Sequence, residues 1–379
     1  MARHLLKKRL MWGMLIAIAM VIAIVGSTLE GSVSAATTTT KFPYIVEELG
    51  TLGGTESTAY SINEAGQVVG ASTTTISSIL PHAVLWNKDK KIDLGALTIH
   101  SGSSAQAINN AGKVVGASQT RNSASTRHAV LWNKGNIIDF ETLDATDSRA
   151  YDINNADQVV GSAAINFNQA QLPVLWDKGN KIDLGTLGGG YGVAEGINNA
   201  GKVVGYSTNS QHVVHAVLWD KGNKVDLGVL GGSPYNHNNN GSLAYDINNA
   251  DQVVGKSNFK ISPVYHAVLW EKGNIKDLGT LGNLGTNRGN FTISTALGIN
   301  DAGKVVGFSE TDKGVRFAVL WDENSIKNLN RLIPPRSGFV LQSAEGINNR
   351  GQIIANGQIV SKGGVVTHRK RAFLLTPVK

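Results

Sequence analysis

The chain has 379 residues, of which 41% are hydrophobic and 17% charged, with 44 glycines and no cysteine. This composition is too apolar for a disordered chain, and the lack of cysteine excludes a disulfide scaffold, a thiolate metal site and a cysteine nucleophile. Lysine and arginine outnumber aspartate and glutamate by only 35 to 28. So small a surplus gives no footprint for nucleic acid, and we expect no nucleic-acid partner.

The N-terminal segment has the three-part pattern of an export signal. Basic residues gather between positions 3 and 9, an almost wholly apolar run covers 10–26, and small residues follow at 33–35. We therefore predict a signal peptide over residues 1–35 and a polar spacer over 36–43. An uncleaved membrane anchor is the alternative, because the apolar run is at the short edge of the membrane-spanning range. Either way the bulk of the chain is expected outside the cytoplasm, secreted or at the cell surface.

Downstream of the spacer, one sequence unit recurs seven times with spacings of 44 to 52 residues. Its most constant feature is an Ile-Asn pair, found at 62/63, 108/109, 153/154, 197/198, 247/248, 299/300 and 347/348. Four short segments rich in Val, Ile, Leu and Trp reappear in fixed order in each unit, as at 194–198, 202–207, 215–219 and 224–230. A period of this length with four strands per unit is typical of a β-propeller blade.

The turn sequences agree with four-stranded blades. The first two segments are joined by an Asn-x-x-Gly turn, as at 63–66, where Asn opens a type I turn and Gly takes the left-handed position that ends it. In two units Asp157 and Asp251 occupy the Gly position, and Asp tolerates that conformation better than most residues. The last two segments are joined by a Lys-Gly hairpin, as at 220–223.

The phase of the repeat predicts how the ring closes. Residues 44–52 match only the fourth segment of a unit, whereas the chain ends with the first three, at 344–348, 352–355 and 372–375. One strand from the start and three from the end would complete a blade and hide two sheet edges. We therefore predict an all-β, seven-bladed β-propeller with four-stranded blades over residues 44–379, closed by pairing of the N-terminal strand with the last three strands.

Two repeated positions predict the core of this propeller. A small residue three positions before each Ile suits the crowded inner strands, and it is Ala at 59, 105, 150, 194, 244, 296 and 344. A bulky residue in the third segment suits the space between diverging blades, and it is Trp at 86, 132, 176, 219, 270 and 321. In the seventh unit Leu375 takes the Trp position.

Three recurring motifs carry a family resemblance. The His-Ala-Val-Leu-Trp string at 215–219, the Ile-Asn-x-Ala-Gly-x-Val-Val-Gly run and the Asp-Leu-Gly-Thr-Leu-Gly-Gly run resemble the HAF repeats of bacterial extracellular proteins, over about residues 44–376. The chain departs from that pattern, since Val replaces Phe except at Phe373, and Leu172, Phe317 and Arg371 replace His. The resemblance implies a secreted or surface-exposed repeat protein and no established catalytic residue.

Two sets of repeated polar residues invite a metal interpretation that the symmetry disfavours. One position of the fourth segment carries Glu48, Asp93, Asp139, Asp183, Asp226, Asp277 and Asn328, and one position of the third carries His82, His128, His215 and His266. Equivalent points on different blades are spread around the ring and meet at one ion only if they line the axis, which third and fourth strands do not. We expect structural hydrogen bonds within each blade instead, and no metal or cofactor.

Ligand binding is expected on the face whose connections vary. The connections after the first and third strands are short and uniform, whereas those after the second and fourth vary, and both variable sets emerge on one face. Aromatic and polar residues there suit recognition of a glycan or a protein surface. The candidate ligand-binding residues are Tyr235, His237, Tyr265, Arg288 and Phe291.

These features favour a secreted, non-catalytic binding scaffold that acts as a monomer, with a glycan or protein ligand and membrane contact only if the signal is uncleaved. The alternative is an extracellular hydrolase or lyase with a site built from loops. No catalytic motif with recognisable spacing occurs, so no catalytic residue is assigned. Two carboxylates, or a His and a carboxylate, of perturbed pKa within hydrogen-bond reach of one cavity on the variable face would favour the enzyme.

Overall fold

The computed structural model describes residues 42–77, 80–120, 123–140, 147–164, 171–231, 241–259, 264–282, 292–323, 325–335, 337–361 and 366–378. The predicted signal peptide and most of the spacer lie outside these residues. In the described part of the chain, no helix has the length and apolar character needed to cross a membrane.

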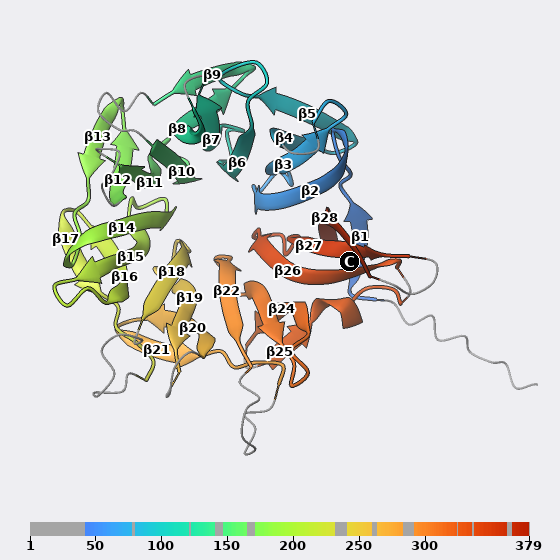
Figure 1. The fold of residues 1–379 in the computed structure, drawn as a ribbon. Helices are drawn as coiled ribbons and strands as arrows, with labels where there is room; N and C mark the ends of the chain where they lie inside the picture. The colour runs from blue at the N-terminus through green and yellow to red at the C-terminus, as the bar shows by residue number, and fades with distance from the viewer. Residues whose placement is uncertain are drawn as a thin grey trace, which may run out of the picture. The chain divides into compact units, whose positions relative to one another are not determined.

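Residues 42–379 form a ring of seven four-stranded antiparallel sheets around a central axis (Figure 1). Six sheets follow the chain order, such as β2-β3-β4-β5, and the seventh has the order β1-β28-β27-β26. We number the blades from 1, which contains β2–β5, to 7, which contains β1 and β26–β28. The predicted seven-bladed propeller with four-stranded blades is confirmed.

The four strands of each blade lie at increasing distance from the axis (Figure 1). The innermost strands are β2 (Gly53–Ile62), β6 (Ser103–Ile108), β10 (Asp147–Ile153), β14 (Gly188–Ile197), β18 (Ser242–Ile247), β22 (Ser294–Ile299) and β26 (Phe339–Ile347). The second strands are β3 (Val68–Thr74), β7 (Val114–Thr120), β11 (Val159–Ala164), β15 (Val203–Asn209), β19 (Val253–Asn258), β23 (Val305–Glu310) and β27 (Ile353–Val360). The third strands are β4 (His82–Asn87), β8 (Ser123–Asn133), β12 (Leu172–Asp177), β16 (Val214–Asp220), β20 (Tyr265–Glu271), β24 (Arg316–Asp322) and β28 (Val366–Pro377). The outermost strands are β5 (Lys90–Gly95), β9 (Asn136–Asp139), β13 (Asn180–Asp183), β17 (Asn223–Asp226), β21 (Asn274–Asp277), β25 (Ser325–Asn328) and β1 (Tyr44–Glu48).

The ring closes between the two ends of the described chain. Strand β1 pairs antiparallel with β28 in a continuous register that runs from Tyr44 opposite Pro377 to Glu48 opposite Phe373. Beyond the strand, the backbone N–H of Leu49 donates to the carbonyl oxygen of Ala372 at 2.9 Å. The predicted closure by the N-terminal strand is therefore confirmed.

The core consists of seven apolar clusters, most of them built between neighbouring blades. In one cluster, Val69 of blade 1 and Val114 of blade 2 pack with Trp132. All six repeated tryptophans are between 2 and 4% exposed, and each fills the gap that opens as two blades diverge from the axis. The repeated alanines of the innermost strands are fully buried, as predicted.

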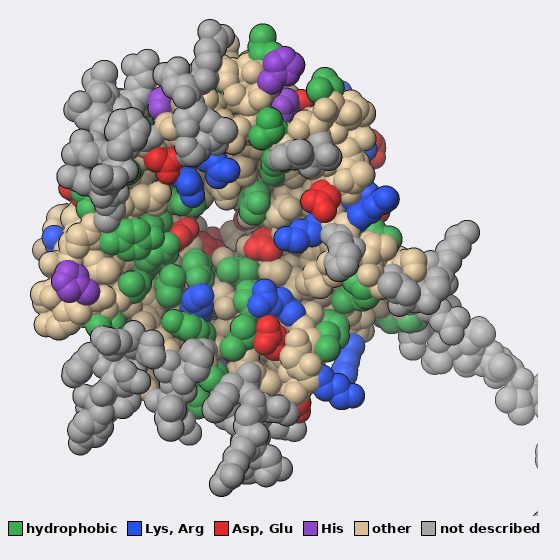
Figure 2. Space-filling view, viewed as in Figure 1, with side chains coloured by type: hydrophobic (Ala, Val, Ile, Leu, Met, Phe, Trp, Pro, Cys, Tyr) green, Lys and Arg blue, Asp and Glu red, His purple; other side chains and the backbone are tan. Residues whose placement is uncertain are grey.

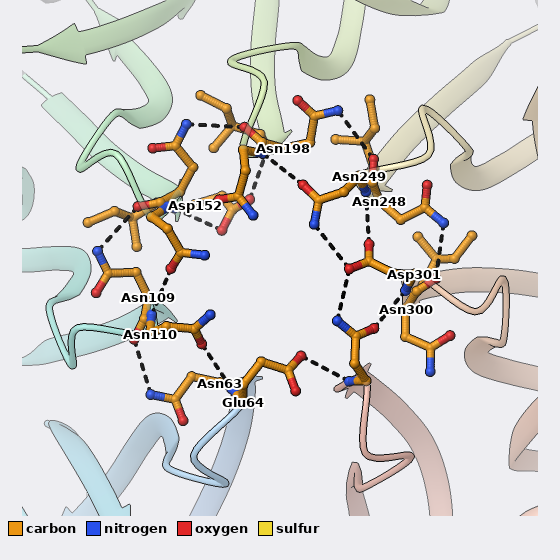
Figure 3. A pocket seen from close by; sticks show the side chains of 18 of the residues that line it. Asn63, Glu64, Asn109, Asn110, Asp152, Asn198, Asn248, Asn249, Asn300 and Asp301 are labelled. Atoms are coloured by element: carbon orange, nitrogen blue, oxygen red, sulfur yellow. Dashed lines mark hydrogen bonds between the residues drawn. The ribbon is translucent and has the colours of Figure 1, made fainter.

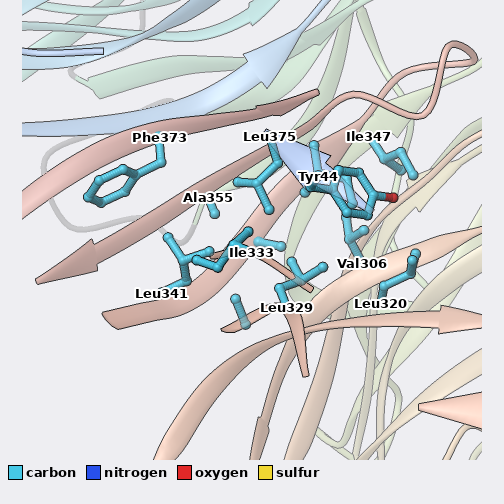
Figure 4. Close-up of a cluster of buried hydrophobic side chains, with 13 residues drawn as sticks. Tyr44, Val306, Leu320, Leu329, Ile333, Leu341, Ile347, Ala355, Phe373 and Leu375 are labelled. Atoms are coloured by element: carbon cyan, nitrogen blue, oxygen red, sulfur yellow. The ribbon is translucent and has the colours of Figure 1, made fainter. Parts of the chain in front are cut away.

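The core of blade 7 is built from different residues, because this blade lacks the repeated Trp (Figure 4). Leu375, which occupies the Trp position, is fully buried in the largest cluster. That cluster also takes in Tyr44 from β1 and Leu329 from the short 3-10 helix η1 (Leu329–Arg331). Side chains from the other chain end and from η1 thus supply volume in the blade that lacks the indole.

In blades 1 to 6 the repeated glycine of the second strand is required by a close approach to the first strand, whereas blade 7 carries Ala355 at this position. A Cβ atom on Gly205 would lie 2.0 Å from the carbonyl oxygen of Val193 on β14, which no side chain tolerates. In the turns, Asp157 and Asp251 adopt φ angles of 65° and 62°. The prediction that Asp replaces Gly in the left-handed position is confirmed.

Candidate functional site

The repeated histidines and acids form pairs inside single blades, as predicted. The Nδ1 atom of His215 lies 2.7 Å from Asp226 Oδ2, and that of His266 lies 2.9 Å from Asp277 Oδ2. His82 and His128 form the same pair with Asp93 and Asp139, at 2.9 and 2.8 Å. In the parts of the chain that the structure describes, no three His, Asp or Glu side chains are grouped to hold a metal ion.

The two exceptions in the acidic set also have structural partners. Asn328, in place of Asp, caps η1 by accepting a hydrogen bond of 2.9 Å from the Asn330 backbone N–H. Glu48 accepts a hydrogen bond of 2.8 Å from Arg371 Nε, so blade 7 replaces the His–Asp pair with an Arg–Glu pair. These residues form hydrogen bonds within their blades.

Four of the predicted ligand-binding residues, Tyr235, His237, Arg288 and Phe291, lie outside the described residues. The fifth, Tyr265, begins β20 and is half-buried. Lys256 Nζ lies 4.9 Å from the centre of its ring and 5.9 Å from that of Tyr245. Tyr245 lines a cavity on the propeller axis. Lys256 therefore contacts Tyr265 on one side and a residue of the central channel on the other.

The turns after the innermost strands surround one mouth of the channel with a ring of polar side chains, and they line a cavity of about 310 Å³ (Figure 3). In each blade the Asn of the Ile-Asn pair donates from Nδ2 to the backbone oxygen of the equivalent Asn in the next blade, at 3.0–3.2 Å. The seven bonds run around the whole ring, from Asn63 through to Asn348 and back. Their Oδ1 atoms accept from backbone N–H groups of their own turns, as Asn63 does from Ala65 and Gln67.

The next residue of each turn forms a second closed ring. Its backbone N–H donates to the side-chain oxygen of the equivalent residue in the next blade at 2.8–3.0 Å. The members are Glu64, Asn110, Asn155, Asn199, Asn249, Asp301 and Asn349. Because both rings join each blade to the next by hydrogen bonds, we assign this mouth to ring closure.

Partly buried carboxylates line the middle of the channel. Asp152 and Asp246 each accept the backbone N–H of the next residue and of an isoleucine in the neighbouring blade, Ile197 and Ile299, at 2.8–2.9 Å. Burial raises the pKa of Asp152 to about 6, against the opposing effect of these N–H groups. Burial, followed by the charge of Asp152, raises the pKa of Asp246 to about 7.

Two glutamates share this part of the channel with them. Burial raises the pKa of Glu195 to about 7, although a hydrogen bond from Tyr206 acts in the opposite direction. Burial also raises the pKa of Glu345, which accepts from Asn356 Nδ2 at 3.1 Å. All four carboxylates line one cavity of about 250 Å³ in the channel.

Comparison of the seven copies shows which channel positions the scaffold leaves free. The residue after each repeated Ala lines the channel cavity of about 250 Å³ in every blade and is Tyr60, Gln106, Tyr151, Glu195, Tyr245, Leu297 and Glu345. The residue after each second-strand Val-Val-Gly, or Ile-Ile-Ala in blade 7, is Ala71, Ala117, Ser162, Tyr206, Lys256, Phe308 and Asn356. The flanking residues repeat closely while these vary, so blade packing does not dictate them.

The second set divides the channel into two halves. Blades 4 to 7 carry large side chains there, and several of them contact charged groups: the Arg316 guanidinium, for example, lies 4.0 Å from the centre of the Phe308 ring. Blades 1 and 2 carry Ala71 and Ala117, which both line a cavity of about 280 Å³. Small side chains at this position leave the space that the cavity occupies.

We call this space the axial cavity; its lining comes from blades 1 to 3. The polar and aromatic residues that line it are Tyr60, Ser103, Ser104, Gln106, Gln119, Arg127, Arg149 and Tyr151. Leu80 and Gly102, from connections after the second and fourth strands, also line it, so it opens on the face with variable connections. Figure 2 shows a central opening with Lys and Arg side chains around it and acidic side chains within.

A larger cavity of about 620 Å³ lies beside the His82–Asp93 pair and is lined by the exposed Ile76 and Ile99. Its polar pair recurs in three other blades, where it stabilises the fold. The axial cavity is the stronger candidate, because its lining includes positions that differ between copies.

Comparisons with known proteins show similarity in fold and not in sequence. No family model and no curated protein sequence matches the chain. Among solved structures, a puromycin-hydrolyzing peptidase of Mycobacterium tuberculosis has a TM-score of 0.50 at 11% identity, over 82% of this chain and 52% of that one. The chain therefore spans about half the length of that peptidase.

Two further solved structures cover most of both chains. The gluconolactonase XC5397 of Xanthomonas campestris has a TM-score of 0.41 at 8% identity, over 88% of this chain and 90% of that one. The SapL1 lectin, in complex with alpha methyl fucoside, has a TM-score of 0.36 at 8% identity, over 88% and 98%. These likenesses concern the propeller fold alone.

Sequence reasoning missed the axial cavity because it looked for variation in connection length. The informative signal was the side-chain variation at two aligned positions of the inner strands. Ala117 by itself carries no sign of a binding site. Only comparison with Tyr206 and Lys256, at the equivalent positions of blades 4 and 5, shows that this position varies between blades.

Proposed function

We propose that the protein is an extracellular, non-catalytic binding scaffold that holds a saccharide in its axial cavity. The observation that carries this proposal is the combination of two tyrosines, Tyr60 and Tyr151, with arginine and glutamine side chains in one cavity. Because the copies differ at the positions of Tyr60, Gln106 and Tyr151, ring stability does not explain why these residues are present.

The chemistry of the lining suits a sugar. An aromatic ring offers a flat apolar surface to the C–H face of a pyranose. The hydroxyl of Tyr60 bonds with Ser104, and that of Tyr151 bonds with Ser162 and Arg149. Gln106 and Ser104 add donors and acceptors for hydroxyl groups, and Gln106 Nε2 already donates to Ser104 Oγ at 2.9 Å. A cavity of about 280 Å³ suits one ring-sized group at the end of a longer chain.

The extracellular location rests on sequence. The basic and apolar N-terminal segment and the resemblance to HAF repeats both support export of the mature domain. Cell fractionation tests this directly: the full-length protein should be found outside the cytoplasm, and a variant lacking residues 1–35 should remain inside. We further propose that the scaffold acts as a monomer, which light scattering of the purified protein would test.

A glycan array tests the binding function and locates its site. The protein should bind a subset of saccharides, Tyr151→Ala should lose them, and the Tyr235→Ala/His237→Ala double variant should keep them. Retained binding by Tyr151→Ala together with loss in the double variant would move the site to the connection that contains Tyr235. Failure of the folded protein to bind any saccharide would remove the proposal.

A second candidate function is supported by the carboxylates of the channel. Glu195, with a pKa of about 7 and the charge of Asp152 nearby, has the character of a general acid in a glycoside hydrolase or lyase. Against this function, Asp152 accepts hydrogen bonds from two backbone N–H groups, and Glu195 accepts one from Tyr206. Both carboxylates therefore already have partners within the protein. Release of reducing sugar that is lost in Glu195→Gln would favour this enzyme over the scaffold.

A further inference from the structure

The axial cavity has an excess of positive charge. Arg127 and Arg149 both line it, and no acidic side chain is found in its lining within the described residues. Serine, glutamine and tyrosine supply the other polar groups. The carboxylates of Asp152, Glu195, Asp246 and Glu345 line the adjoining cavity deeper in the channel, which shares Tyr60, Gln106 and Tyr151 with this one.

Arg149 is incompletely neutralised. Its Nη2 atom lies 3.3 Å from Asp147 Oδ2, which also accepts from Gln171 Nε2 at 3.2 Å. The other oxygen of Asp147 accepts the backbone N–H of Arg127 at 3.0 Å. The Nε atom of Arg149 is buried and has no hydrogen-bond partner among the described residues. A buried donor without an acceptor is costly, so Asp147 satisfies only part of this guanidinium.

Arg127 is the second cation of the cavity. It is exposed, and no acidic side chain in the described part of the chain forms an ion pair with it. Arg127 and Arg149 thus line one cavity, and the carboxylate beside them, that of Asp147, is shared among several donors. A guanidinium presents its donors as a planar fork that matches the two oxygens of a carboxylate.

We propose that the ligand is an acidic saccharide, whose carboxylate binds Arg149 and Arg127 while its ring packs on Tyr151 and Tyr60. This inference rests on the proposed saccharide-binding function and narrows it to chains that carry uronic acid residues. The deeper carboxylates repel the acidic group and leave it at the arginine side of the cavity, where Gln106 and Ser104 can bind the ring hydroxyls. The binding energy therefore depends on charge, which neutral sugars do not offer.

Paired probes test the charge requirement. Oligomers of galacturonate, glucuronate and mannuronate would be titrated into the protein alongside their methyl esters, which keep the ring and remove the charge. At least one acid form should bind about tenfold or more tightly than its ester, because hydrogen bonds to charged groups are the stronger class. Binding of the acid form should weaken as salt is raised, since the Arg127 end of the cavity is open to solvent.

Arginine variants test the assignment. Arg149→Gln and Arg127→Gln should each weaken binding of the acid form about tenfold while leaving the ester unchanged, and Arg149→Lys should restore part of the loss. The matched control is Arg316→Gln, which removes a cation from blade 6, where it pairs with Glu310 at 3.2 Å. This control should bind as the wild type does. Thermal unfolding of each variant establishes that it folds.

The outcomes separate this inference from the function on which it rests. Esters that bind as tightly as acids, or Arg→Gln variants that bind acids normally, would overturn the acidic specificity while leaving saccharide binding in place. Binding of neutral oligosaccharides alone on the array would do the same. Failure of every saccharide to bind would overturn the proposed function and the specificity together.

Discussion

Arg371 donates a hydrogen bond of 2.8 Å from Nε to Oε1 of Glu48, a residue 323 positions away in the sequence. The pair occupies the positions that hold a His–Asp pair in four other blades, with one member from each end of the described chain. Together with the β1–β28 register, it makes blade 7 complete only when the two ends meet. The channel and its cavities exist because this ring is closed.

Removal of the N-terminal strand should therefore open the ring. Deletion of residues 36–52 removes β1 and the buried Leu49, and it exposes the edge of β28 and part of the blade 7 core. We expect the melting temperature to fall by more than 10 °C, with increased aggregation from the unpaired edge. Differential scanning calorimetry makes the comparison, and an unchanged melt would show that the pairing contributes nothing.

The asparagine ring should be sensitive to a single deletion. Asn348→Ala removes the bond to the Asn63 backbone and leaves N–H groups of the turn at Arg350 and Gln352 without their acceptor. Because these groups are largely buried, we expect the free energy of unfolding to fall by about 2–3 kcal/mol in urea titration. The exposed Asn136→Ala serves as the control and should cost less than about 0.5 kcal/mol. Equal effects in the two variants would contradict the role of the ring.

The interblade indoles should dominate core stability. Trp132→Ala removes a side chain that is 3% exposed and contacts both blades 1 and 2, so we expect a loss of about 3–5 kcal/mol. Ile138→Ala, at a residue 47% exposed in the same blade, should lower the free energy of unfolding by about 1 kcal/mol or less. Chemical denaturation measures both. A loss below 1 kcal/mol for Trp132→Ala would show that the indole does not bridge the blades.

Stability should depend on pH through the channel carboxylates. Asp152 and Asp246 have folded-state pKa values of about 6 and 7, above their ordinary value of 3.8. Between pH 3.8 and these folded-state values the folded state binds more protons than the unfolded state, so the contribution of both groups is fully present below about pH 3.8 and is lost as pH rises through about 6 and 7. The pKa of Asp322, lowered first by its hydrogen bond from Lys327, acts below this window. Its contribution is lost only as pH falls below 3.8.

Paired asparagine variants isolate this effect. The Asp152→Asn/Asp246→Asn double variant keeps a carbonyl oxygen at each site but does not titrate, so its melting temperature should change less between pH 5 and pH 8 than that of the wild type. Asp89→Asn, at an exposed hairpin residue, should follow the wild type. A double variant with the wild-type slope would place the titration elsewhere.

The blade architecture was predictable because the same residue types recur at equivalent positions of the seven units. The Ile-Asn pairs, the Ala and Trp series and the partial units at the two ends each predict one feature that the structure contains, including the pairing of β1 with β28. The hydrogen bonds from Asn63 to the next blade were not predictable, since turn chemistry explains the same residue within its own blade. Their role depends on how closely neighbouring turns approach the axis.

The candidate site was less accessible to sequence reasoning. Arg149 and Asp152 are three positions apart on β10, yet one lines the axial cavity and the other bridges two blades at the channel. The register shift between Ala150 and Asp152 sets these directions, and no local pattern in the sequence indicates it. The size of the cavity likewise depends on Ala71 and Ala117 facing the same space.

The most direct test of the central claim is to fill the axial cavity and measure saccharide binding. Ala117→Tyr introduces the residue that blade 4 already carries at the equivalent position, Tyr206, so the blade should accept it and the melting temperature should stay within a few degrees. On an array of neutral and uronic acid oligosaccharides, the wild type should bind and Ala117→Tyr should not, while Phe308→Ala in the opposite half should bind as before. A folded Ala117→Tyr variant that binds the same saccharides as the wild type would contradict the account.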